Sequence, residues 1–368
     1  MLRTATLCAL IGVLSASAQE TSPADQAEAQ DDRLTFGGLV QTQFNTTSAD
    51  ATDDTQLTLR RVRLGATAEV SPVLTGRIQA ELAPAAVGGS AELNEAYVLF
   101  RPASAFGVLA GKGGRPFGIV DLTGAGDLVP IERGARFRGA NPVAQYKVLE
   151  ALAYAGRSVG VQVLGDLDGP LPVTYAAGYF TGALSEEGGD ADIRQLAGRV
   201  TVAPIDGLAL SVAATSRAFS ASDPVGLGPD GALGADPTGE TRRGAAFAVD
   251  AEVGSNGAPG FHAVAEVAVG TINPFTDARF RTAQGWVDYR IPLGGALLTA
   301  VQPLVRVSVA DVDAPSALAP SDGVLLTPGV NLYGAQGTRL MLNLDVFYPS
   351  ADGADVLSAF RAQAQVAF

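Results

Sequence analysis

The stretch Leu340-Met341-Leu342-Asn343-Leu344-Asp345-Val346 has an apolar residue at every second position, with an asparagine and an aspartate among the residues between them. Successive side chains of a β-strand point to opposite faces, so a period of two predicts a strand with one apolar and one more polar face. The same period recurs in the stretches Val159–Val163, Leu208–Val212 and Phe261–Val269. The sequence therefore predicts an all-β fold.

These alternating runs are long and numerous. About sixteen of them, each about ten residues long, match the strand signature of membrane barrels better than the strands of about five to six residues that are usual in a soluble β-sandwich. They are centred near residues 40, 63, 78, 96, 109, 161, 177, 198, 213, 248, 265, 287, 304, 330, 343 and 362.

The links between the runs fall into two lengths. Short links lie near residues 71–72, 102–104, 204–207, 294–295 and 334–337, and longer ones span residues 46–54, 84–90, 218–241, 271–281, 311–324 and 349–355. Tight turns at one end and longer loops at the other are typical of transmembrane barrels, in which closure satisfies every backbone polar group. We therefore predict a transmembrane antiparallel β-barrel of about 16 strands over residues 33–368.

Both ends of the chain indicate export to an outer membrane. A basic start, an apolar run and the exit Ser15-Ala16-Ser17-Ala18 are typical of a signal peptide over residues 1–18 that is cleaved near Ala18. Residues 19–32 are acidic and lack periodicity, which predicts a disordered leader. The alternating end, residues 360–368, closes on Phe368 and is similar to the terminal strand that barrel-insertion machinery recognises. We expect the mature protein in the outer membrane of a Gram-negative bacterium.

The composition excludes several classes of function. Acidic residues outnumber basic ones by 38 to 25, so the chain has no basic surface large enough for nucleic acid. The one cysteine, Cys8, lies within the predicted signal peptide, and we expect no disulfide, no metal site and no cofactor. The one histidine, His262, lies on an alternating run without a serine or aspartate arrangement, and Gly111–Gly114 lacks P-loop spacing. These features predict that the protein is not an enzyme.

Four stretches resemble the phosphate-selective porin O and P family: Leu57–Gly65, Leu93–Val98, Gly111–Gly118 and Ile131–Arg133. Weaker similarity follows in residues 177–182 and 285–289 and in the last strand, so the likeness covers nearly all of the mature chain. The resemblance implies a barrel of sixteen strands, usually a homotrimer, in which a long third outer loop folds inward and narrows the channel. Residues 113–155 form the longest link, and loops beyond about fifteen residues are usually functional, so we expect them to be that loop.

An anion-preferring pore needs fixed positive charge at its narrowest point, and the planar fork of arginine suits phosphate and carboxylate oxygens. Arg61 and Arg63 alternate with Val62 and Leu64, so they are expected to face the lumen. Arg60 breaks the alternation, which predicts either a bulge that turns it inward or a place at a rim. The candidate constriction and anion-binding residues are Arg60, Arg61, Arg63, Arg77, Lys112, Arg133, Arg136 and Arg138. The resemblance supports the Arg60–Arg63 and Lys112 stretches but does not place Arg136 or Arg138.

The expected function is passive diffusion of small solutes, with a preference for small anions such as phosphate. Two alternatives stay open. The first is a general porin without selectivity, in which the arginines only order a water-lined wall by pairing with Glu69, Glu81, Glu95 and Glu132. The second is a structural or adhesive barrel without an open pore. The acidic stretches at residues 50–54, 185–192 and 311–313 are expected to repel anions at the outer mouth. The expected partners are small solutes or anions, outer-membrane lipid and two further copies of the chain.

Overall fold

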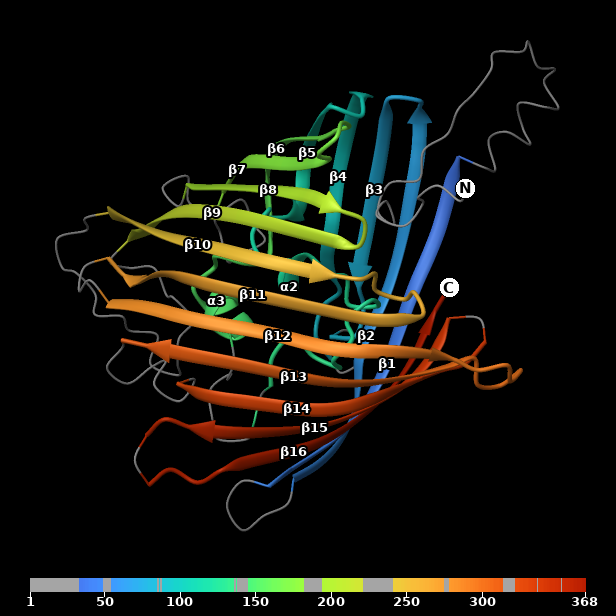
Figure 1. Cartoon of the computed structure of the whole chain (residues 1–368). Helices are drawn as coiled ribbons and strands as arrows, with labels where there is room; N and C mark the ends of the chain where they lie inside the picture. The colour runs from blue at the N-terminus through green and yellow to red at the C-terminus, as the bar shows by residue number, and fades with distance from the viewer. Residues whose placement is uncertain are drawn as a thin grey trace.

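The computed structural model describes residues 33–48, 54–84, 86, 88–135, 137, 145–181, 194–220, 241–274, 278–313, 322–335, 337–351 and 353–368. Within these ranges the chain forms a closed antiparallel barrel in which every strand pairs with its neighbours in sequence (Figure 1). The sixteen strands are β1 (Leu34–Ser48), β2 (Asp54–Ser71), β3 (Leu74–Glu81), β4 (Glu92–Ala103), β5 (Phe106–Gly114), β6 (Arg157–Leu167), β7 (Val173–Phe180), β8 (Gln195–Ile205), β9 (Leu208–Ser220), β10 (Thr241–Val253), β11 (Gly260–Asn273), β12 (Ala278–Pro292), β13 (Ala300–Val312), β14 (Gly323–Tyr333), β15 (Thr338–Pro349) and β16 (Leu357–Ala367).

Closure is made by the first and last strands. β1 pairs with β16 from Leu39 opposite Ala367 to Ser48 opposite Ser358, and the backbone of Phe368 exchanges two hydrogen bonds with Gly38. The start of β1 and the end of β16 therefore lie at the same end of the barrel (Figure 1). The predicted barrel of sixteen strands is confirmed, and each predicted run centre falls inside one strand.

The alternation of side chains separates an apolar outer face from a polar inner face. On β13 the even-numbered Gln302, Arg306 and Ser308 are buried inside the barrel, whereas Val305 and Val307 are exposed on its outside. Exposed valine, leucine and aromatic side chains continue this outer face around the strands. An apolar exterior around a polar interior is the arrangement that a barrel in lipid requires.

This orientation predicts a depth-dependent cost for outward-facing charge. Val305→Arg places a guanidinium near the middle of β13 on the outer face, and the free energy of unfolding is expected to fall by ~2–4 kcal/mol. The matched change Val301→Arg lies near the end of the same strand and is expected to cost ~0–1 kcal/mol. Urea unfolding in phospholipid vesicles measures both values, and equal costs would contradict the membrane-facing assignment.

The links differ from the sequence-based expectation at two places. The long link expected over residues 271–281 is mostly strand, because the alternation continues to Asn273 in β11 and resumes at Ala278 in β12. The turn expected at residues 294–295 spans residues 293–299 instead. Tight two-residue turns do occur at residues 72–73, 104–105 and 206–207, and Gly207 adopts the positive φ of 76° that such a turn accommodates at little steric cost.

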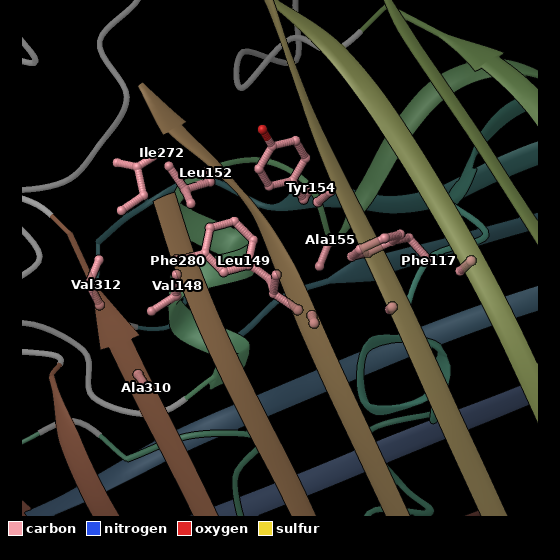
Figure 2. Close-up of a cluster of buried hydrophobic side chains, with 14 of the residues drawn as sticks. Phe117, Val148, Leu149, Leu152, Tyr154, Ala155, Ile272, Phe280, Ala310 and Val312 are labelled. Atoms are coloured by element: carbon pink, nitrogen blue, oxygen red, sulfur yellow. The ribbon is translucent and has the colours of Figure 1, made fainter. Parts of the chain in front are cut away.

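Residues 115–156, here called the β5–β6 segment, carry the short helices α2 (Ile119–Leu122) and α3 (Gln145–Ala151). Of the helices that the structure describes, none is long and apolar enough to cross a membrane. Side chains of the segment form an apolar cluster with the inner wall of β9–β13 (Figure 2). The segment contributes Phe117, Val148, Leu149, Leu152, Tyr154 and Ala155, and the wall contributes Ala213, Phe219, Ala246, Ala248, Ala268, Ile272, Phe280, Ala310 and Val312.

Small wall residues make this contact possible. Ala246, Ala248 and Ala268 are buried and short, so they leave space for the larger Leu149 and Leu152 at native packing density. The phenol of Tyr154 packs near Phe280, with ring centroids 5.9 Å apart, and donates a hydrogen bond to the carbonyl of Thr271. Part of the interior beside β9–β13 is therefore occupied by apolar side chains, and the same strands also bury polar side chains such as Glu266 and Arg306.

Candidate pore constriction

Residues 125–133 of the β5–β6 segment are held along the inner wall through their backbone carbonyls. An irregular backbone leaves carbonyl acceptors without strand partners, and buried acceptors must be satisfied. Here the wall supplies the donors: Gln41 on β1 donates to Ala125, Gln365 on β16 and Arg339 on β15 to Gly126, Asn331 on β14 to Val129, Arg306 on β13 to Glu132, and Gln284 on β12 to Arg133. Side chains of six strands thus fix the path of this piece.

A cavity of about 1260 Å³ lies beside the anchored segment, against the wall of β1–β5. The side chains that line it carry more positive than negative charge. Its basic residues are Arg60, Arg61, Arg63, Lys112, Arg133, Arg157 and Arg361, and its acidic residues are Glu81, Glu92, Glu132 and Glu150. This local excess of basic residues contrasts with the net charge of −13 for the whole chain.

A β-bulge brings two successive arginines to the cavity. In the pairing of β1 with β2, Arg61 lies opposite Gln41 and Leu59 lies opposite Thr42, so Arg60 is the extra residue. A bulge re-aims a side chain that the strand period would point outward. Arg60 consequently reaches Glu132 with two nitrogen–oxygen contacts, of 2.5 and 3.1 Å, and Arg61 reaches the same carboxylate at 3.2 Å. The sequence left open whether Arg60 lies in a bulge that turns it inward or at a rim, and the structure shows the bulge.

The other strand arginines also pair with carboxylates. Arg63 contacts Glu81 at 2.8 Å. Arg77 contacts one carboxylate oxygen of Glu95 at 2.8 Å, and the other oxygen of Glu95 accepts a hydrogen bond from Arg157 at 3.1 Å. Arg77 faces inward as expected but is not among the residues that line the cavity. The structure therefore brings together Arg60, Arg61, Arg63, Lys112 and Arg133 and leaves Arg77 beside them.

Arg133 has a role that the sequence did not indicate. Its guanidinium donates to the backbone carbonyls of Val120, Asp121 and Thr123, so it clamps α2 as well as lining the cavity. Arg136 and Arg138 of the predicted constriction lie outside the described residues.

Two cavity arginines were not predicted as site residues. Arg361 is buried on the inner face of β16 and contacts Asp345 at 3.1 Å. The alternation of the last strand indicated its direction, but not its place in the lining of the same cavity as Arg60. Arg157 starts β6 on the same parity as the outward Val159 and Val161, so the strand period pointed it the wrong way. At a strand end its long side chain turns inward to Glu95, which periodicity cannot predict.

Glu132 is the acidic centre of the site. Burial alone would raise its pKa, but the guanidinium groups of Arg61 and Arg60 hold the pKa of Glu132 well below the usual range of a glutamate. The carboxylate is therefore ionised throughout the neutral and mildly acidic range.

His262 faces inward and belongs to the wall, and it has an aspartate partner that its sequence context did not reveal. Its Nδ1 lies 2.7 Å from Asp288 and its Nε2 3.1 Å from Glu252, and Gln302 donates a hydrogen bond to the other oxygen of Asp288. Both ring nitrogens are thus engaged by carboxylates that are themselves part of the wall network.

Comparisons with known proteins agree with this architecture. The model of the family "Phosphate-selective porin O and P" matches residues 25–226. No curated protein matches the sequence.

Among solved structures, similar folds include an anion-selective porin from Comamonas acidovorans (13% identity, 91% of this chain and 99% of that chain, TM-score 0.60). They also include OprB of Pseudomonas putida (11% identity, 94% and 96%, TM-score 0.62) and the outer-membrane channel DcaP of Acinetobacter baumannii (12% identity, 91% and 97%, TM-score 0.59). At these identities the structures establish the fold alone.

The family model covers more than half of the chain, and the closed barrel has the apolar exterior that outer-membrane porins share. The chain therefore belongs to the phosphate-selective porin O and P family, and it is a porin of the Gram-negative outer membrane.

Proposed function

We propose that the protein is a passive diffusion channel that favours small anions, phosphate among them. The observation that carries this proposal is the cavity against β1–β5, where seven basic and four acidic side chains meet in a protein of net charge −13. Fixed positive charge in a narrow, low-dielectric passage raises the local concentration of anions and speeds their entry. Guanidinium groups also replace part of the hydration shell of an oxyanion.

In this proposal the β5–β6 segment is the third outer loop, and it narrows the channel. The apolar cluster with β9–β13 supports this, because it occupies part of the interior there, whereas the cavity with its excess of basic residues lies against β1–β5. The carbonyl contacts of residues 125–133 support a fixed constriction rather than a moving gate.

The remaining assignments follow the same proposal. Residues 1–18 are a signal peptide removed near Ala18, residues 19–32 are a leader, and residues 33–368 are the porin domain. The channel acts as a homotrimer and without catalysis or cofactor, and its partners are small anions and outer-membrane lipid. His262, held between two wall carboxylates, has no part in chemistry.

A general porin without charge preference is the second candidate. Pairing of Arg63 with Glu81 and of Arg77 with Glu95 favours it, since paired charges order a wet wall without producing a strong field.

Solute permeation separates these candidates and the non-conducting barrel. Liposomes that contain the refolded protein should swell faster in an anionic solute, such as a small carboxylate, than in an uncharged solute of similar size. Equal rates would leave the general porin, and the absence of swelling together with the absence of single-channel current would leave a structural barrel.

A further inference from the structure

The carboxylate of Glu132 lies where an oxyanion solute would bind. Arg60 presents its Nε and Nη2 to the two carboxylate oxygens at 2.5 and 3.1 Å, and Arg61 adds Nη2 at 3.2 Å. A guanidinium fork and a second guanidinium around one carboxylate are the recognition geometry for a solute carboxylate or phosphate. The ligand in this site is a side chain of the protein itself.

The backbone that carries Glu132 is fixed independently of the arginines that bind its side chain. The carbonyl of Glu132 accepts a hydrogen bond from Arg306 at 2.5 Å, and the carbonyl of Arg133 accepts one from Gln284 at 2.9 Å. Arg306 is fully buried and also contacts Asp345 at 2.9 Å. Replacement of the Glu132 side chain therefore leaves the anchors of its backbone in place.

Arg60 is also accessible from the cavity, whereas the Arg61 side chain is only 6% exposed. The Arg60 side chain is 39% exposed, whereas that of Glu132 is 13% exposed, and both line the cavity together with Arg361. A solute in the cavity thus meets the open side of a guanidinium whose other side holds Glu132.

We propose that Glu132 is a built-in competitor of the solute: it occupies the oxyanion site of Arg60 and Arg61 and so sets how tightly that site holds a passing anion. The inference rests on the proposed anion preference and names the residue that tunes it. A channel needs binding strong enough to admit an ion and weak enough to release it. A tethered carboxylate weakens the site without removing its charge field.

Glu81 provides the matched control. It lines the same cavity and pairs with Arg63, but its carboxylate also accepts hydrogen bonds from the backbone nitrogens of Val62 and Ala83 at 2.8 and 3.3 Å. Glu81→Gln and Glu132→Gln remove the same charge from the same cavity. Only the second change vacates a site that two guanidinium groups share.

The test is block of single-channel chloride current by inorganic phosphate in the wild-type channel, Glu132→Gln and Glu81→Gln. We expect the phosphate concentration that half-blocks Glu132→Gln to be at least about tenfold lower than the concentrations that half-block the wild type and Glu81→Gln. A tenfold change corresponds to about 1.4 kcal/mol in the free energy of phosphate binding. Equal shifts in the two variants would show a field effect only, and no shift in Glu132→Gln would show that Glu132 does not compete; either result overturns the inference.

A second variant keeps the test valid if Glu132→Gln fails to fold. Glu132→Asp retains the charge but withdraws the carboxylate by one methylene. Its half-block concentration of phosphate should be lower than that of the wild type and of Glu81→Gln, and higher than the value expected for Glu132→Gln. A wild-type value in folded Glu132→Asp overturns the inference. The proposed function is tested separately, because its failure appears in the wild-type channel alone, as the absence of anion preference or of any current, whatever the variants do.

Discussion

Replacement of both Arg61 and Arg63 by alanine is expected to remove most of the anion preference of the channel. The two side chains supply two of the seven basic groups of the cavity, which would leave five against four acidic ones. A unit charge 4 Å from a permeating ion contributes about 1 kcal/mol in water and about 4 kcal/mol at an effective dielectric constant of about 20. The ratio of chloride to potassium permeability should therefore fall at least about tenfold, as measured by the zero-current potential in a KCl gradient.

The control for this double change removes the same charge elsewhere. Arg243 and Arg281 are exposed near the strand ends and are not among the residues that line the cavity, so their double replacement by alanine should leave the permeability ratio nearly unchanged. Heat-dependent mobility on gels reports whether each variant is folded. If the control pair shifts the zero-current potential as much as the cavity pair, the total charge of the protein, and not the cavity, sets selectivity.

Leu152→Asp is expected to release the β5–β6 segment from the wall and to raise single-channel conductance severalfold. Leu152 is fully buried in the apolar cluster with β9–β13 (Figure 2), so the variant places a carboxylate among apolar side chains. Burial of an unpaired charge costs several kcal/mol. This cost is expected to exceed the stabilisation that the short segment gains from its contacts with the wall. Departure of α3 from the wall opens the part of the interior that the cluster now occupies.

Leu122→Asp is the matched control for the second prediction. Leu122 belongs to α2 in the same segment but is 38% exposed, so its replacement should leave conductance unchanged. Exclusion of polymers of graded size from the pore measures the opening independently. Unchanged conductance and polymer cut-off in folded Leu152→Asp would contradict the view that the apolar cluster narrows the channel.

The sequence predicted the barrel because each strand is governed by one local rule. Alternation along stretches such as Leu340–Val346 fixes which side chains face lipid, and this rule also identified the anomaly at Arg60 that proved to be a bulge. Arg61 and Arg63 face inward for the same reason.

The site was predicted less completely, because its geometry depends on an irregular segment. No periodicity indicates that carbonyls 125–133 lie against donors from six strands, or that Arg133 clamps α2. The position of Glu132 between Arg60 and Arg61 joins residues far apart in the chain, and the sequence offered it only as one of four possible partners. Arg157 was missed because the alternation of β6 assigns its position to the outer face, whereas its side chain turns inward to Glu95.

The most direct test of the central claim is the sign of the zero-current potential of the wild-type channel in a planar bilayer with a KCl gradient. Seven basic and four acidic residues in the cavity predict that chloride carries more current than potassium, despite the acidic composition of the whole chain. A zero-current potential that indicates preference for chloride supports the claim that the arginines of the cavity set the selectivity. A potential of the cationic sign would contradict it and show that the net negative charge of the chain governs permeation.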